Sequence, residues 1–135
     1  MASPLPPVVD LPAEKPFVIE SAPQLERTAS SADGRRLDGW RQPPTRVRFK
    51  DTDTAFEFET SAAFAVGLQD PSSATARFEH RASYHRPDGT AVIDSSLSAS
   101  ATEGEYLLNG ELTVTWNGQG MAERRWTARI PRRFG

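Results

Sequence analysis

Tyr106-Leu-Leu-Asn-Gly-Glu-Leu-Thr-Val-Thr-Trp116 alternates between apolar and polar side chains, and Asn117-Gly118 follows it directly. In an extended chain successive side chains point to opposite faces, so one face of this stretch is apolar. That face holds Leu108, Leu112, Val114 and Trp116. Asn-Gly is a strong signal for a two-residue hairpin turn. The stretch therefore predicts a strand and a tight turn, with a second strand over Met121 to Ile130.

The same pattern extends toward the N-terminus. Residues 75–86 and 90–100 alternate on either side of the turn Pro87-Asp-Gly89, which makes Ala74 to Arg133 a four-stranded antiparallel meander. Residues 46–50 and 54–59 predict a further hairpin, and no helical apolar stripe of ten residues occurs. Short strands separated by turns predict an all-β protein, an antiparallel β-sandwich of jelly-roll type.

The first 44 residues have a different composition, because they hold eight of the eleven prolines. Proline disfavours helices and central strands. We expect a Pro-rich extended arm and linker over residues 1–44 and the β-sandwich domain over residues 45–135. Within the linker, Phe17 to Glu20 predicts a short edge strand, and Asp33-Gly34 and Asp38-Gly39 predict turns.

The three tryptophans are candidates for anchoring the fold. We expect Trp40 to anchor the linker to the sandwich. Trp116 and Trp126 should lie across the last hairpin from one another, with Trp126 in the core. If Trp126 is a core residue, its replacement by alanine should cost about 3–5 kcal/mol.

Composition limits the classes of function. The chain has no cysteine, a formal charge of −2 and no stretch near the ~18 apolar residues of a membrane helix. Residues 121–135 carry five arginines against Glu123 alone, which indicates a solvent-exposed strand face rather than a nucleic-acid site. No signal peptide follows Met1, so we expect a cytoplasmic protein with no nucleic-acid or membrane partner.

The sequence contains no recognisable catalytic constellation. A nucleophile elbow of the form G-x-S-x-G is missing, and Ser95-Ser-Leu-Ser98 lies inside a strand pattern. His80 and His85 are five residues apart, so a strand sends them to opposite faces, with His80 on the apolar one. Asp51 and Asp53 fit a turn better than a calcium loop, which needs a central glycine and a terminal glutamate.

Glu57 and Glu59 share a polar strand face, and nothing marks a pocket around them. We therefore predict no catalytic residue, no cofactor-binding residue and no metal ligand.

Three segments together resemble a known family. They are Gln69-Asp-Pro-Ser-Ser-Ala-Thr-Ala-Arg-Phe-Glu79, Leu112-Thr-Val-Thr-Trp-Asn-Gly-Gln-Gly120 and Glu123-Arg-Arg-Trp-Thr-Ala-Arg-Ile-Pro-Arg132. Over roughly residues 30–133 the chain resembles the C-terminal jelly-roll domain of the X-Pro dipeptidyl-peptidase and cocaine-esterase family of serine hydrolases. Family members often carry an Asp-Ala-Thr-His segment where this chain has Ala101-Thr-Glu-Gly-Glu-Tyr106.

The resemblance implies a role beside an enzyme. In that family the jelly roll packs against an α/β-hydrolase domain, which bears the Ser-Asp-His triad, and a helical cap. Nothing here matches the triad, so the implied function is a non-catalytic module with a hydrolase domain or subunit as partner. Two alternatives stay open: a ligand-binding or protein-binding sandwich with no hydrolase link, and an autonomous enzyme. A homodimer is also open. An uncovered apolar patch would favour the hydrolase module, whereas a closed apolar cavity would favour ligand binding.

Overall fold

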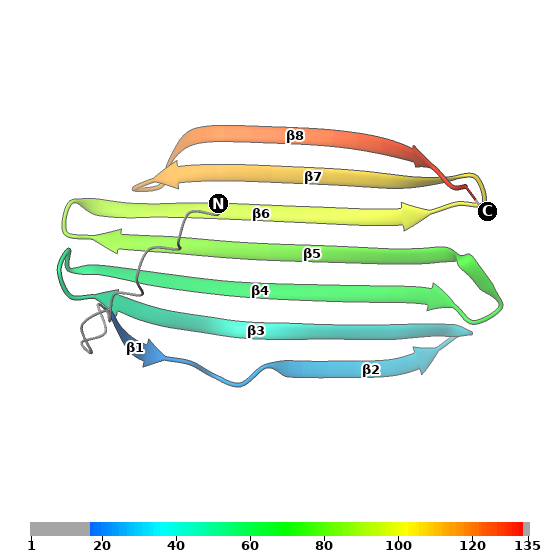
Figure 1. Cartoon of the computed structure of the whole chain (residues 1–135), viewed down its shortest axis with the longest axis horizontal. Coiled ribbons are helices and arrows are strands. Elements are labelled where there is room, and N and C mark those ends of the chain that lie inside the picture. Colours follow the sequence, from blue (N-terminus) through cyan, green and yellow to red (C-terminus); the bar gives the residue numbers. More distant parts are fainter. Residues whose placement is uncertain (1–16, 134–135) are drawn as a thin grey trace, which may run out of the picture.

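The computed structural model describes residues 17–133, which form one open, entirely antiparallel sheet of eight strands (Figure 1). From β3 onward the sheet is a meander, and β1 and β2 both pair with β3 along one edge. The strands are β1 Phe17–Ser21, β2 Glu26–Ala32, β3 Arg35–Phe49, β4 Thr54–Gly67, β5 Asp70–Arg86, β6 Gly89–Ala101, β7 Glu105–Trp116 and β8 Gln119–Pro131. The predicted all-β antiparallel class is confirmed.

Turn chemistry fixes the register at both ends of the sheet. Asn117 and Gly118 have φ values of 49° and 80°, and Asp33 and Gly34 have 53° and 72°. Two successive positive φ values are those of a type I′ turn, whose twist matches that of the strands it joins. Asn117 also ties the last hairpin to β6, because the backbone N–H of Thr90 donates to its Oδ1 at 2.8 Å.

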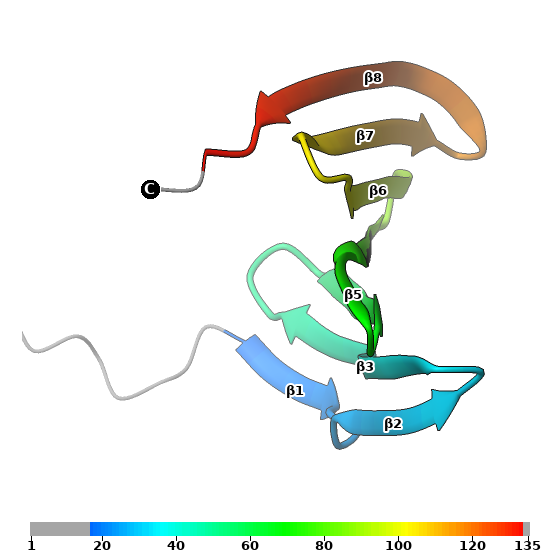
Figure 2. The same cartoon turned by 90° about the vertical axis from the view of Figure 1, so that its right-hand side faces the viewer.

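The described chain is a single layer. Turned by 90°, the sheet is one strongly twisted ribbon of strands, with β8 and β1 at opposite edges (Figure 2). Such a sheet corresponds to one layer of a β-sandwich. The register divides its side chains between two faces.

We call one surface the apolar face. It is defined by Trp40, Val47, Phe56, Phe58, Phe64, Phe78, Tyr84, Ile93, Leu97, Leu108, Leu112, Val114, Trp116 and Trp126. We call the other surface the charged face. It is defined by Arg41, Arg46, Glu57, Glu59, Arg77, Glu79, Arg81, Asp94, Glu111, Glu123 and Arg125.

Because nothing in the described chain lies over the apolar face, its side chains are only partly buried. Among the described residues the buried apolar side chains are those of Pro43 and of the alanines Ala55, Ala62 and Ala82, and no large side chain is fully buried. Aromatic rings pack side by side instead: Phe56 lies 4.7 Å from Tyr84 and Phe64 lies 5.5 Å from Phe78, measured between ring centroids. The sheet therefore lacks the enclosed core that stabilises a domain of this size.

The structure corrects the predicted boundary between residues 44 and 45, which falls inside β3. Residues 17–21, 26–32 and 35–44 are strand residues of the sheet, and Asp38-Gly39 is strand rather than turn. Pro43-Pro44 does not end β3 because it occupies a bulge, where the register shifts between Gln42 and Thr45. The predicted edge strand at Phe17 is confirmed as β1. The extended arm expected over residues 1–16 lies outside the described residues.

Two expectations about the tryptophans are also wrong. Trp126 pairs with Gly110 and Trp116 with Gln119, so the two rings are not directly opposite one another. Trp126 is 50% exposed and is not a core residue of the described chain. Trp40, in contrast, is half-buried on β3 between Ala62 and Arg27.

Candidate functional site

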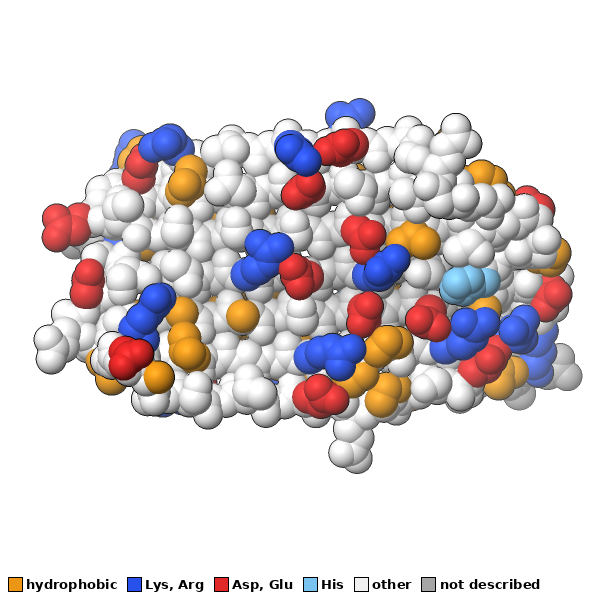
Figure 3. Space-filling model, turned by 180° about the vertical axis from the view of Figure 1, so that it is seen from behind, with side chains coloured by type: hydrophobic (Ala, Val, Ile, Leu, Met, Phe, Trp, Pro, Cys, Tyr) orange, Lys and Arg blue, Asp and Glu red, His pale blue; other side chains and the backbone are white. Residues whose placement is uncertain are grey.

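Compensated ion pairs dominate the charged face (Figure 3). Arg41 binds Glu59 at 3.4 Å, Arg81 binds Asp94 at 3.5 Å, and Arg125 of the C-terminal strand binds Glu111 at 3.2 Å. All of these side chains are more than a third exposed. Exposed pairs contribute about 0–1 kcal/mol each. The predicted solvent-exposed arginine face of the last strand holds for Arg125 and Arg129, whereas Arg124 lies on the apolar face.

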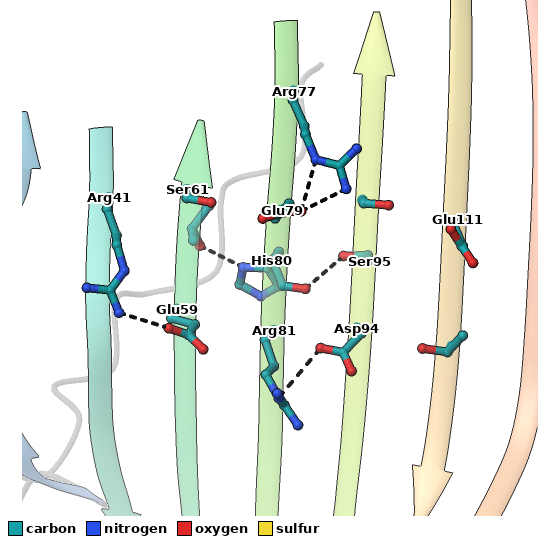
Figure 4. Close-up of a pocket in the computed structure, with 13 residues that line it drawn as sticks. Arg41, Glu59, Ser61, Arg77, Glu79, His80, Arg81, Asp94, Ser95 and Glu111 are labelled. Carbon is teal, nitrogen blue, oxygen red and sulfur yellow. Dashed lines mark hydrogen bonds and ion pairs between the residues drawn. The ribbon is translucent and has the colours of Figure 1, made fainter. Parts of the chain in front are cut away.

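Between these pairs lies a shallow, open hollow of about 480 Å³, which crosses β3 to β7 (Figure 4). Arg77 crosses its upper part and binds Glu79 at 2.8 Å. A second open hollow of about 730 Å³ adjoins it and is bordered by small residues such as Gly39, Ala63 and Ser98. The carboxylates that line the first hollow, such as Glu59, Glu79 and Asp94, each bind an arginine. That hollow therefore offers polar contacts, and its carboxylates are not aligned as an acid–base pair.

His80 lies on the apolar face, as predicted, and makes no catalytic set. Its Nδ1 is 2.7 Å from Thr60 Oγ1. Ser95 Oγ donates to the backbone carbonyl of His80 at 3.3 Å and not to the ring. A nucleophile–base pair requires the hydroxyl on the imidazole and a third group orienting the ring. The side chains that form hydrogen bonds with His80 among residues 17–133 are those of Thr60 and Ser95, and the carboxylate next along the chain, Glu79, lies on the opposite face.

The other polar residues considered from the sequence also make structural contacts. His85 lies on the charged face and contacts Thr90 Oγ1 at 3.3 Å, so the two histidines do not converge. Glu57 accepts from Arg46 at 3.3 Å. Asp53, with a φ of 47°, completes a turn and binds Arg48 at 2.9 Å. Among residues 17–133, no three His, Cys, Asp or Glu side chains gather closely enough to hold a metal ion.

Two arginines have pKa values displaced by their partners. A hydrogen bond to Asp38, reinforced by its charge, raises the pKa of Arg36. Glu20 does the same to Arg48, with a smaller contribution from Asp53. Both guanidiniums stay charged throughout the biological pH range, so neither shift prepares a group for catalysis. Within the described residues, no helix is long and apolar enough to span a membrane.

The apolar face is the largest unexplained feature of the molecule. Six strands of at least 12 residues, with β1 and β2 sharing a seventh sheet position, span about 40 Å by 34 Å. The footprint of this face, polar residues included, is therefore roughly 1,400 Å². The largest apolar patch on an ordinary monomer is about 300–600 Å², and a standard interface buries about 800 Å² per partner. Exposed aromatics, among them Phe64, Phe78 and Tyr84, stand on this surface.

One part of the apolar face is hollowed. A depression of about 280 Å³ lies between Phe64 and Tyr106. Its floor is made by alanines of β5 and β6, namely Ala74, Ala76, Ala99 and Ala101. The depression is open to solvent, as are the two hollows of about 480 Å³ and 730 Å³.

Sequence alternation predicted which side chains share this face but not that the face is uncovered. No family model, curated protein or solved structure gives a significant match to this chain.

Proposed function

We propose that this chain is a non-catalytic β-sheet module that packs its apolar face against a serine hydrolase of the α/β type. The observation that carries the proposal is the uncovered apolar face of roughly 1,400 Å². Phe78 and Tyr84 are each 37% exposed on it, and Trp126 is 50% exposed. Covering a surface of this size with protein removes apolar area from water at about 25 cal/mol per Å².

Other features favour a supporting role over the two alternatives. A ligand-binding sandwich would hold its ligand in a closed apolar cavity, whereas the hollows here are open. An autonomous hydrolase would need a nucleophile on a base, and Ser95 donates to a backbone carbonyl instead. The hydrolase identity of the partner rests on the resemblance of the closing segment Glu123 to Arg132 to the X-Pro dipeptidyl-peptidase and cocaine-esterase family.

The first test is co-purification from the native cells. A lysate is labelled with a fluorophosphonate probe, which reacts with active serine hydrolases, and the tagged chain is isolated without denaturation. We expect a complex whose native mass equals this chain plus one labelled hydrolase. A monomer, or a dimer of this chain alone, without label would contradict the proposal.

Matched variants then locate the contact. Phe78→Asp places a charge on the apolar face, and Arg77→Asp places the same side chain one residue earlier on the charged face. We expect the first variant to lose the labelled partner and the second to retain it. Equal retention by both variants would show that the hydrolase binds elsewhere.

A further inference from the structure

A row of mostly polar residues crosses the middle of the apolar face. Cross-strand pairing aligns Gln42, Thr60, His80, Ser95, Leu112 and Arg124, and we call this line the polar row. Most of its polar groups are satisfied within the chain. Gln42 Nε2 donates to the carbonyl of Pro23 at 2.9 Å, and Thr60 contacts His80 Nδ1. The second ring nitrogen of His80, Nε2, has no partner among the described residues.

The charge of the apolar face is unbalanced. Asp38 on this face binds Arg36 at 2.9 Å. Arg124 in the polar row and Arg27, which pairs in register with Trp40, form no ion pair with any residue of the described range. Arginines of the charged face contrast with these two, as Arg41, Arg77, Arg81 and Arg125 each bind a carboxylate. The surplus charge of the apolar face is therefore cationic.

These groups are spread evenly over the surface. Arg27 lies on β2, His80 on β5 and Arg124 on β8, so three strand spacings, or about 14 Å, separate each from the next. Arg27 also lines an open hollow of about 380 Å³ together with Leu25, Trp40, Gln42 and Thr60. An incoming side chain would meet a guanidinium there beside an indole ring.

We infer that the partner surface is apolar and acidic, with carboxylates opposite Arg27 and Arg124 and a hydrogen-bonding group opposite His80 Nε2. This inference rests on the proposed function, because it concerns the surface that covers the apolar face. A guanidinium buried without a counter-charge is strongly unfavourable, and a buried ring nitrogen needs a hydrogen-bond partner. Carboxylates supply both through charge-assisted hydrogen bonds.

A different role for the two arginines predicts a different result. A charge on an edge strand that points toward the apolar side discourages edge-to-edge aggregation. Arg27 and Arg124 both lie on edge strands of the sheet. That role needs no anion, so it leaves the face with no preference for an anionic apolar ligand over a neutral one.

A pair of dyes measures this preference on the full chain alone. 8-Anilinonaphthalene-1-sulfonate combines apolar rings with one negative charge, and N-phenyl-1-naphthylamine is its uncharged analogue. We expect Arg27→Glu and Arg124→Glu each to weaken binding of the sulfonate about fivefold or more, with binding of the neutral dye unchanged. Arg125→Glu, next along β8 but on the charged face, should affect neither dye.

Several outcomes would overturn the inference. One is sulfonate binding that is unchanged in both variants, and another is equal weakening by Arg125→Glu. Binding of the neutral dye reports that the face remains folded. Where a glutamate variant also loses the neutral dye, Arg27→Gln and Arg124→Gln remove the charge without adding an acid and give the same comparison. No hydrolase takes part in this dye assay. A negative result here would therefore overturn the inference about the acidic partner surface, whereas failure to co-purify a labelled hydrolase would contradict the proposed function.

Discussion

At the scale of single residues, Gly110 shows how the sheet accommodates one of its three tryptophans. Gly110 is buried, and the indole of Trp126 lies over it from the neighbouring strand. A Cβ at position 110 would overlap the ring atoms. A glycine in a strand often marks such a close approach, and an aromatic residue opposite it restores the lost packing.

We expect Gly110→Ala to lower the free energy of unfolding by about 1–3 kcal/mol, because the ring must move. Gly120→Ala is the matched control within β8, because a Cβ added at position 120 would have no other atom within 4 Å. That control should change stability by no more than about 0.5 kcal/mol. Urea unfolding of the two variants gives the comparison. Equal effects would mean that Trp126 does not rest on Gly110 in solution.

Residue-level predictions from sequence succeeded where they depended on alternation alone. The placement of His80 and His85 on opposite faces followed from their odd spacing and is confirmed. The assignment of Trp126 to the core failed for a different reason. Alternation predicts the face of the sheet on which a side chain lies. It does not predict whether other atoms cover that face, which is what would make the side chain a core residue. The described strands make one layer, so Trp126 stays half-exposed.

At the scale of elements, β3 is the least predictable strand. Its first part pairs with β2, whose residues are all exposed and mostly polar, so no apolar alternation reveals either strand. The Asp33-Gly34 turn was visible in the sequence and is confirmed, yet Pro43-Pro44 suggested an end to the fold. Pairing with β4 on both sides of this dipeptide, between Gln42 and Thr60 and between Thr45 and Phe58, overrides that local signal.

The bulge at Pro43-Pro44 absorbs one extra residue of β3, because Gln42 pairs with Thr60 and Thr45 with Phe58. Deletion of Pro44 should therefore give a regular ladder that keeps Val47 opposite Phe56 on the apolar face. We expect the free energy of unfolding to change by about 1 kcal/mol or less, which is the size of the effect of a proline on the unfolded chain. Hydrogen exchange in β1, which pairs with this half of β3, should be unchanged. Pro44→Ala, which keeps the residue count, is the matched variant. A loss of more than about 2 kcal/mol in the deletion variant alone would contradict this register.

At the scale of the whole molecule, the described chain is a single sheet with two unlike faces. Its charged face is suited to water through compensated ion pairs, and its apolar face is suited to contact with protein. Strand count and order followed from turn spacing over residues 74–133. The single-layer arrangement did not, because an alternating pattern is the same whether the second layer comes from the same chain or from another molecule.

The most direct test of this account is photo-crosslinking in the native cells. A benzoyl-phenylalanine is placed at Phe78 on the apolar face or, as a control, at Glu79 on the charged face. We expect position 78 to crosslink to a fluorophosphonate-reactive serine hydrolase and position 79 not to. Crosslinks from position 78 only to a second copy of this chain, or equal crosslinking from both positions, would contradict this account.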